Sequence, residues 1–224
     1  CTVKQESAAP NTVPRSRSPA PSAQHPRDDG DAQALWTFRC GSLVWRPDFT
    51  YSDSPVGFVR GYSRHFWQGD TFHRGSDKMP GGVVTLLEDH EGCTRGVTYQ
   101  VPGKQVSEAL KFLNVREAVP GSYDTKEVTF YLQDAPDQPR KALAYVASPE
   151  LPGYLGPVPE EAIARQILVC RGFSGHNLEY LLRLADCMQL CGPQAQAEQL
   201  AAIVDAVGTM LPCFCPTEQA LALV

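Results

Sequence analysis

The sequence lacks the long apolar segments of a membrane protein. No apolar run reaches the roughly 18 residues that a membrane-spanning helix needs, and the first thirty residues contain no apolar core of a secretory signal. Basic residues are also scarce, since 20 Lys and Arg face 25 Asp and Glu and the net charge is -5. Such a chain lacks the basic footprint of a nucleic-acid-binding protein. We expect a cytosolic protein that neither spans a membrane nor binds nucleic acid.

Several familiar catalytic and metal-binding patterns are missing as well. The chain has no G-x-S-x-G, P-loop, H-E-x-x-H or G-x-G-x-x-G motif. The eight cysteines are scattered, and Cys213 and Cys215 form an isolated C-x-C with no His or second Cys pair at zinc spacing. Four histidines show neither metal-ligand spacing nor a partnered nucleophile: His65, His73, His90 and His176. The cysteines are therefore expected to be free thiols, and no metal site is expected.

The chain divides into a polar tail and one folded domain. Residues 1–33 contain five prolines among Ser, Gln and charged residues, with no aromatic residue. This segment has too little apolar surface to offset the entropy of ordering, so it is predicted to be disordered. It is either a passive tail or an arm for regulation or partner docking. Residues 34–224 are expected to form a single domain of ordinary size.

The domain is rich in strand patterns first and in helix patterns later. Strands bounded by Gly, Asp or Pro are expected at 34–39, 56–67, 82–88, 93–101, 126–132 and 141–147. Helices are expected at 104–118, from Pro159 to about 170, at 175–191 with Ser174 as its cap, and at 194–207. This order predicts an α+β fold in which the strands close into a small barrel.

The first candidate site is the segment that follows the first strand. Phe38-Arg39-Cys40-Gly41-Ser42-Leu43 carries a short apolar strand into a Gly-Ser turn. Such a turn can direct successive backbone N–H groups outward, where they bind an anion such as a ligand carboxylate. The alternative is a plain turn that ends the strand.

The second candidate is Glu117, near the end of the predicted helix 104–118. Helical spacing places it on one face with Val106, Leu110 and Leu113, so it stands where another leucine is expected. Burial and the negative end of the helix dipole would both raise its pKa. A carboxyl tuned in this way can accept a proton and return it. The alternative is a frayed helix end with Glu117 in solvent or paired with Arg116.

Two segments together resemble the ChaC family of γ-glutamylcyclotransferases. They are the strand with G-S-L and V-W at 38–45 and the helix ending in F-L-N-V-R-E at 112–117. The loop 67–76 and the segment 172–181 also fit, so the resemblance spans 34–224. It implies a small mixed β-barrel flanked by helices. It also implies conversion of glutathione to 5-oxoproline and cysteinylglycine without metal or organic cofactor.

The resemblance also assigns roles to residues. The loop formed by Phe38, Arg39, Cys40, Gly41, Ser42 and Leu43 would hold the γ-glutamyl end of the substrate, and Glu117 would be the catalytic acid and base. Ser174 and Tyr180 are further candidates for the pocket wall. By resemblance alone, a Notch precursor is a partner and the Golgi a second location.

The chain departs from the family pattern at three sensitive positions. Arg39 and Cys40 stand where the family has Gly and Tyr, and Gly82 stands where it has Arg. Arg95 also replaces a Trp in a predicted strand. These changes keep a second interpretation open, in which the protein is a catalytically weakened relative that binds or regulates.

Overall fold

The computed structural model describes residues 34–117, 123–192 and 198–214. The predicted tail 1–33 lies outside this part, as do the side chains of Glu117, Cys213 and Phe214. Five strands form a closed barrel in the order β1-β3-β2-β4-β5. They are β1 (Leu35–Arg39), β2 (Val56–Asp70), β3 (Gly81–Val101), β4 (Asp124–Leu132) and β5 (Arg140–Val146). β1 pairs in parallel with β5 and the other pairs are antiparallel, so the predicted mixed barrel is confirmed.

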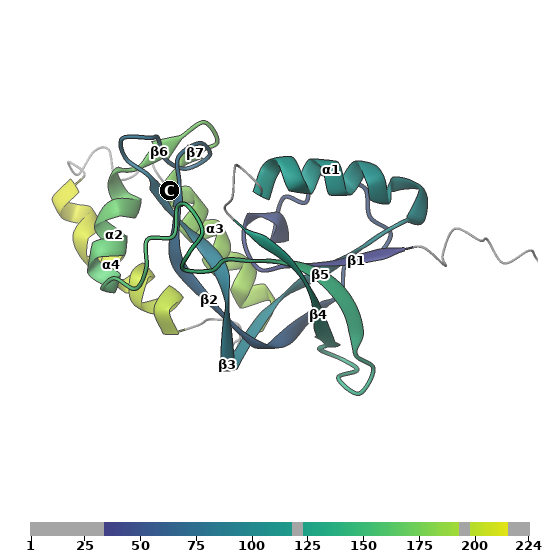
Figure 1. Ribbon diagram of the computed structural model, residues 1–224. Coiled ribbons are helices and arrows are strands. Elements are labelled where there is room, and N and C mark those ends of the chain that lie inside the picture. The colour runs from purple at the N-terminus through teal and green to yellow at the C-terminus, as the bar shows by residue number, and fades with distance from the viewer. Residues whose placement is uncertain (1–33, 118–122, 193–197, 215–224) are drawn as a thin grey trace, which may run out of the picture.

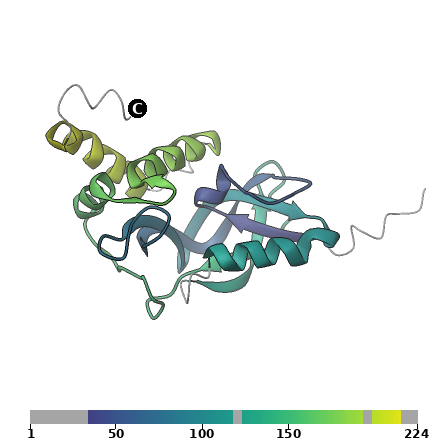
Figure 2. The same cartoon turned by 90° about the horizontal axis from the view of Figure 1, so that it is seen from above.

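The helices lie on two sides of the barrel (Figure 1). They are α1 (Val106–Glu117), α2 (Glu160–Val169), α3 (Asn177–Leu190) and α4 (Glu198–Phe214). The view from above shows α1 apart from the group formed by α2, α3 and α4 (Figure 2). A small hairpin of β6 (Arg171–Gly172) and β7 (Gly175–His176) precedes α3. The predicted α+β class is therefore confirmed.

Three apolar clusters hold these parts together. The barrel interior is filled from alternate strand positions, and the rings of Phe38 and Phe130 lie 5.8 Å apart there. A second cluster joins β2 and β3 to the three grouped helices and includes the fully buried Ile167 and Leu184. The third lies beneath α1, where Leu113 is fully buried. Because α1 has its own contact with the barrel, its position relative to β1 is fixed.

The predicted strands 82–88 and 93–101 were wrong as separate elements, because β3 runs through both. Tyr62 pairs with Glu88 and Arg60 with Cys93, so residues 89–92 face Gly61 across a bulge. Gly61 has φ of 81°, a left-handed value that glycine adopts without strain. The exposed polar residues of this bulge have the composition of a turn, which explains the mistaken break.

The predicted start of α3 was also wrong. His176, not Ser174, occupies the N-cap position, and it makes no side-chain capping bond. The Ser174 hydroxyl instead lies 2.9 Å from Nδ1 of His73. The β6–β7 hairpin separates Ser174 from the helix, and its two-residue strands are too short to leave a hydrophobic pattern. The start of α2 at Pro159 and Glu160 is as predicted.

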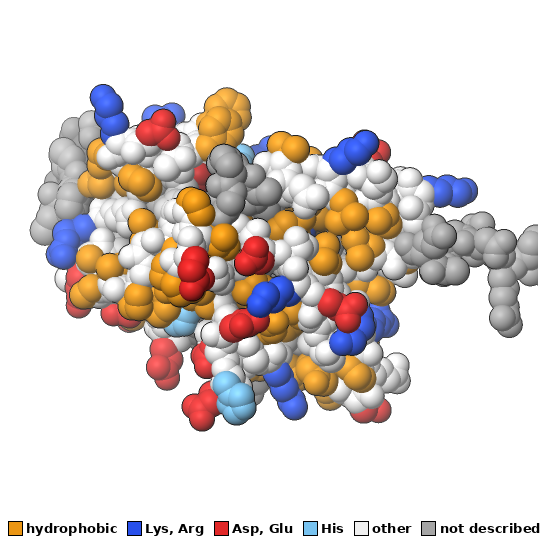
Figure 3. All heavy atoms as spheres, viewed as in Figure 1, with side chains coloured by type: hydrophobic (Ala, Val, Ile, Leu, Met, Phe, Trp, Pro, Cys, Tyr) orange, Lys and Arg blue, Asp and Glu red, His pale blue; other side chains and the backbone are white. Residues whose placement is uncertain are grey.

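The surface agrees with the charge balance of the sequence. On the face drawn in Figure 3, basic side chains stand among acidic ones over the barrel strands. Within the described ranges, no helix has the length and apolar character required to cross a membrane.

Candidate functional site

A cavity of about 770 Å³ opens between α1 and the β6–β7 hairpin. This volume suits a small organic ligand. Its walls come from the end of β1, the end of β2, the start of β3, the last turns of α1 and the start of α3. All six residues of the predicted loop line it: Phe38, Arg39, Cys40, Gly41, Ser42 and Leu43. Ser174 and Tyr180 line it too.

The Gly-Ser turn is the opening of a short 3-10 helix, Ser42–Val44. The hydroxyl of Tyr99 donates to the carbonyl of Leu43 at 2.9 Å and so anchors this turn to β3. Burial raises the pKa of Tyr99, which keeps the hydroxyl protonated as a donor. The first N–H groups of such a turn have no partner within it, so they are available to a ligand in the cavity.

The backbone at Gly41 lies close to the side chains of Val84 and Tyr180, which favours glycine at this position. A Cβ atom at this position would lie 3.1 Å from Cγ2 of Val84 and 3.4 Å from the hydroxyl of Tyr180. The Tyr180 hydroxyl itself accepts a bond from the backbone N–H of Val84 at 3.1 Å. The turn is thus packed directly against β3 and α3, and even a methyl group at Gly41 would require Val84 to shift by a few tenths of an ångström.

The end of α1 is bonded to this turn. Arg116 donates from Nη2 to Oγ of Ser42 at 3.0 Å and from Nη1 to Oδ2 of Asp48 at 3.2 Å. One turn earlier in α1, Leu113 packs against Leu43. The sequence considered Arg116 only as a partner for Glu117, whereas here it joins α1 to the loop. Glu117 is the last residue of α1, and its predicted pKa and side-chain position lie outside the described part.

Two of the three departures from the family pattern line the cavity. Arg39 is only 5% exposed, and its guanidinium carbon lies 4.5 Å from the ring centroid of Tyr145. Cys40 is half-buried, and its carbonyl accepts a bond from Arg64 at 3.4 Å. Gly82 is not among the lining residues. Its backbone N–H and carbonyl both bond to the side chain of Asn177, at 2.7 and 2.8 Å. The expectation that the missing Arg side chain at Gly82 weakens the pocket stays a prediction.

Arg95 is accommodated at the barrel surface. Its Nη1 donates to Oε1 of Gln133 at 3.0 Å, and its guanidinium carbon lies 5.7 Å from the ring centroid of Phe58. The charge reaches polar partners while the alkyl chain covers the strand, as long basic side chains commonly do. The arginine is therefore no obstacle to the barrel.

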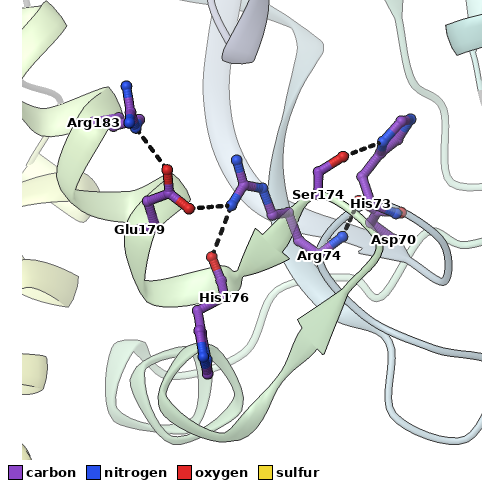
Figure 4. Close-up of polar contacts among 7 residues, drawn as sticks. All are labelled: Asp70, His73, Arg74, Ser174, His176, Glu179 and Arg183. Carbon is purple, nitrogen blue, oxygen red and sulfur yellow. Dashed lines mark hydrogen bonds and ion pairs between the residues drawn. The ribbon is translucent and has the colours of Figure 1, made fainter. Parts of the chain in front are cut away.

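The loop predicted at 67–76 forms the far wall of the cavity. β2 extends to Asp70, whose carboxylate accepts bonds from the backbone N–H groups of Phe72, His73 and Arg74, each at 2.9 Å. The hairpin is bonded alongside, since Phe173 donates to the carbonyl of Phe72 at 2.8 Å. The neighbouring N–H of Ser174 donates to the carbonyl of His73 at 2.9 Å. Figure 4 shows this junction of the loop and the hairpin.

Arg74 extends from this wall into an ionic network. Its Nη1 donates to the carbonyl of His176 at 2.9 Å and to Oε2 of Glu179 at 3.1 Å. Glu179 also accepts from Arg183 at 2.8 Å. Burial tends to raise the pKa of Glu179, but the bonds from the two arginines outweigh it and hold that pKa below its usual value.

Arg74, Arg116 and Tyr145 are among the cavity residues that sequence reasoning missed. Arg74 stands in a polar loop whose composition resembles any turn, and Tyr145 belongs to a strand pattern explained by the barrel core. Arg116 was visible as a neighbour of Glu117, but its contact with Ser42 depends on how α1 packs.

The described residues offer no metal centre. Nowhere in 34–117, 123–192 or 198–214 do three His, Cys, Asp or Glu side chains gather as a metal ion requires. Each of the five cysteines that the structure describes is free: Cys40, Cys93, Cys170, Cys187 and Cys191.

The fold places the protein in a known structural class. A crystal structure described as γ-glutamyl cyclotransferase specific to glutathione, from yeast, superposes with a TM-score of 0.72. The alignment covers 79% of this chain and 96% of that one at 24% sequence identity, so it establishes the fold alone. The barrel with flanking helices is therefore a γ-glutamylcyclotransferase-like fold.

The sequence narrows the class to one family. Residues 35–210 match the family of ChaC-like proteins. Human "Glutathione-specific gamma-glutamylcyclotransferase 1" is 85% identical over 222 residues, which is 99% of this chain and 100% of that protein. A Danio rerio protein of the same name is 54% identical over 76% of this chain and 87% of its own length. The chain belongs to the ChaC-like family.

Proposed function

We propose that this protein degrades glutathione by cyclising its γ-glutamyl group, which yields 5-oxoproline and cysteinylglycine. The full-length identity of 85% to a human protein named for this activity supports the proposal. The observation that carries it is structural. Arg116, the residue before Glu117, bonds the end of α1 to Ser42 at the cavity wall, which supports a shared site for the proposed acid and the proposed substrate loop. The weakened binding protein is the less favoured interpretation.

The loop 38–43 is proposed to hold the γ-glutamyl end of the substrate. The N–H groups at the start of the Ser42–Val44 turn would bind the α-carboxylate or the developing oxyanion. Tyr99 and Arg116 hold this turn from two sides, so the donors are fixed before the substrate arrives. Preorganised donors of this kind favour the transition state because they need no rearrangement during the reaction.

Glu117 is proposed to move the protons of the reaction. It removes a proton from the α-ammonium of the substrate, and the resulting amine attacks the γ-carbonyl carbon. A C–N bond closes the five-membered ring, and the bond to the cysteinyl nitrogen then breaks. Glu117 returns its proton to that nitrogen, so the carboxylate is regenerated. The ring nitrogen loses its second proton, which ends on the amine of cysteinylglycine, so the products are a neutral lactam and an ammonium group. The attack is intramolecular, so the protein has no second reactant to bring in and needs only to hold the substrate with its amine close to its γ-carbonyl. No protein nucleophile and no cofactor is needed.

Product analysis tests the proposal. The purified protein should convert glutathione to equal amounts of 5-oxoproline and cysteinylglycine, measured by mass spectrometry. Free glutamate in place of 5-oxoproline would indicate hydrolysis and refute cyclisation. Bound glutathione without either product would support the binding protein instead.

A role for a Notch precursor and a Golgi location are proposed from the resemblance alone. The cytosolic location is proposed from the sequence features given above, and so is 1–33 as a separate arm. Deletion of 1–33 should leave the rate of glutathione turnover unchanged, while co-precipitation with a Notch precursor should be lost if the arm carries that role. A large loss of turnover on deletion would contradict the separation.

A further inference from the structure

We propose that Arg74 binds the C-terminal carboxylate of the leaving peptide, which is cysteinylglycine in glutathione. Arg74 would thereby select γ-glutamyl peptides over uncharged γ-glutamyl amides. This inference rests on the proposed function and names the substrate class of the same cavity. It concerns the wall opposite the Gly41–Ser42 turn, for which neither the sequence motifs nor the names of relatives assign a role.

Arg74 is a buried cation with part of its guanidinium uncommitted. The residue is 8% exposed and lines the cavity. Both of its side-chain bonds, to Glu179 and to the carbonyl of His176, use Nη1. Across the described ranges, Nε and Nη2 bond to no other residue, and Figure 4 shows Nη2 directed away from both partners of Nη1. Both nitrogens are donors, so they are available to a ligand group or to water in the cavity that Arg74 lines.

The guanidinium of Arg74 is only partly neutralised by its neighbours. Glu179 is shared between Arg74 and Arg183, so Arg74 has only part of one carboxylate as its ion-pair partner. Asp70 is the other acid beside Arg74, and its carboxylate oxygens are already bonded by three backbone N–H groups. The Nε and Nη2 edge of a guanidinium matches a carboxylate in two parallel bonds.

Arg74 and the substrate loop lie at two ends of one cavity. Tyr180 stands between them, because its ring centroid lies 5.9 Å from the guanidinium carbon of Arg74 and its hydroxyl lies against Gly41. With the γ-glutamyl group at Gly41, the leaving amine extends toward Arg74. A peptide such as cysteinylglycine ends in a carboxylate at that side.

The position of Arg74 is rigidly set, which selective binding requires. Its backbone N–H is bonded to Asp70, and the hairpin is closed beside it through Gly175, whose φ is 110°. A Cβ atom at Gly175 would lie 2.9 Å from Oε2 of Glu179 and 3.3 Å from Nη1 of Arg74. The glycine therefore makes room for the ion pair that holds the guanidinium.

The test compares glutathione with glutathione C-terminal amide, which differs only in the terminal charge. The protein should show a kcat/KM for the acid at least about tenfold above that for the amide, on the scale of a charge-assisted pair. Arg74→Gln should remove this preference by lowering kcat/KM for the acid alone. Arg183→Gln is the matched control, because Arg183 is the other arginine bonded to Glu179 but does not line the cavity. The Arg183→Gln protein should keep the preference for the acid over the amide.

Equal kcat/KM for acid and amide in the unmodified protein would overturn the inference even if Arg74→Gln fails to fold. An equal loss on both substrates in Arg74→Gln would also overturn it, since that indicates a purely structural role. If the unmodified protein forms no 5-oxoproline, the proposed function fails separately. Calorimetric binding of the two compounds then decides the matter, and equal affinities would refute a role for Arg74.

Discussion

The bond between Arg116 and Ser42 gives the sharpest test of how the cavity is assembled. It joins the end of α1 to the substrate loop at 3.0 Å, and the Arg116 side chain is 19% exposed. We expect Arg116→Met and Ser42→Ala each to lower kcat/KM, because either change releases α1 from the turn. A hydrogen bond to a charged group contributes about 1.5–3 kcal/mol. Partial solvent exposure favours the lower end of that range, which corresponds to about tenfold in rate.

The assay is a double-mutant cycle on kcat/KM for glutathione. If the two residues act through one bond, the double variant should be about as slow as Arg116→Met alone, with a coupling energy near 1.5 kcal/mol. Lys111→Met is the control, because Lys111 is an exposed cation on the same helix, and it should change the rate less than about twofold. Additive losses in the double variant, without coupling, would refute the assignment of Arg116 as the residue that positions α1 on the loop.

Three further predictions concern the packing and titration of the chain. Gly41→Ala should lower kcat/KM about tenfold with little change in Tm, because the new Cβ meets Val84 at 3.1 Å. Gly208 has open space around it, so Gly208→Ala is the control and should be neutral. A fully active Gly41→Ala protein would contradict the close approach. Leu113→Ala should destabilise by about 2–5 kcal/mol in urea unfolding, since Leu113 is fully buried under α1, and a loss below about 1 kcal/mol would contradict that burial. Burial lowers the pKa of His65, although a hydrogen bond with Gln199 acts to raise it. The unfolded chain therefore takes up the proton first, and stability should fall as pH drops through about 6.5. His65→Gln should reduce the loss of Tm between about pH 8 and pH 5, and an unchanged loss would count against the assignment.

The barrel and the helices were predictable where local patterns were long. The strand β4 follows the alternating apolar residues Val128, Phe130 and Leu132, and α2 begins at Pro159 and Glu160 as helix chemistry favours. β3 was divided in two because the exposed residues of its bulge look like a turn. The bulge is maintained by pairing with β2, which is a long-range contact and leaves no trace in the local sequence.

The candidate site was predictable as a loop and a helix end, but its assembly was not. The sequence identified residues 38–43, and all of them line the cavity. It could not place Arg74 or Arg116, because their roles depend on contacts with residues about 70 to 105 positions away along the chain. It also assigned Ser174 to a helix cap, since a serine before a helix pattern has that local preference, whereas packing gave its hydroxyl to His73.

The replacement of the family's Gly by Arg at position 39 illustrates the same limit. From the sequence alone, a long cationic side chain in the proposed substrate loop predicts an impaired pocket. In the folded protein its guanidinium lies over the ring of Tyr145, so the barrel contains it without disrupting β1. Its effect on the rate depends on how the substrate lies in the cavity.

The most direct test of the catalytic account is the turnover of glutathione by Glu117→Gln beside Glu108→Gln. Both changes neutralise an acid of α1, but Glu108 lies exposed in the first turn of the helix, far along it from the loop. We predict that Glu117→Gln lowers kcat by about 10²–10⁴-fold, as expected for loss of a general acid and base, while Glu108→Gln retains nearly full activity. A Glu117→Gln protein that keeps more than about a tenth of the parent rate would contradict the account.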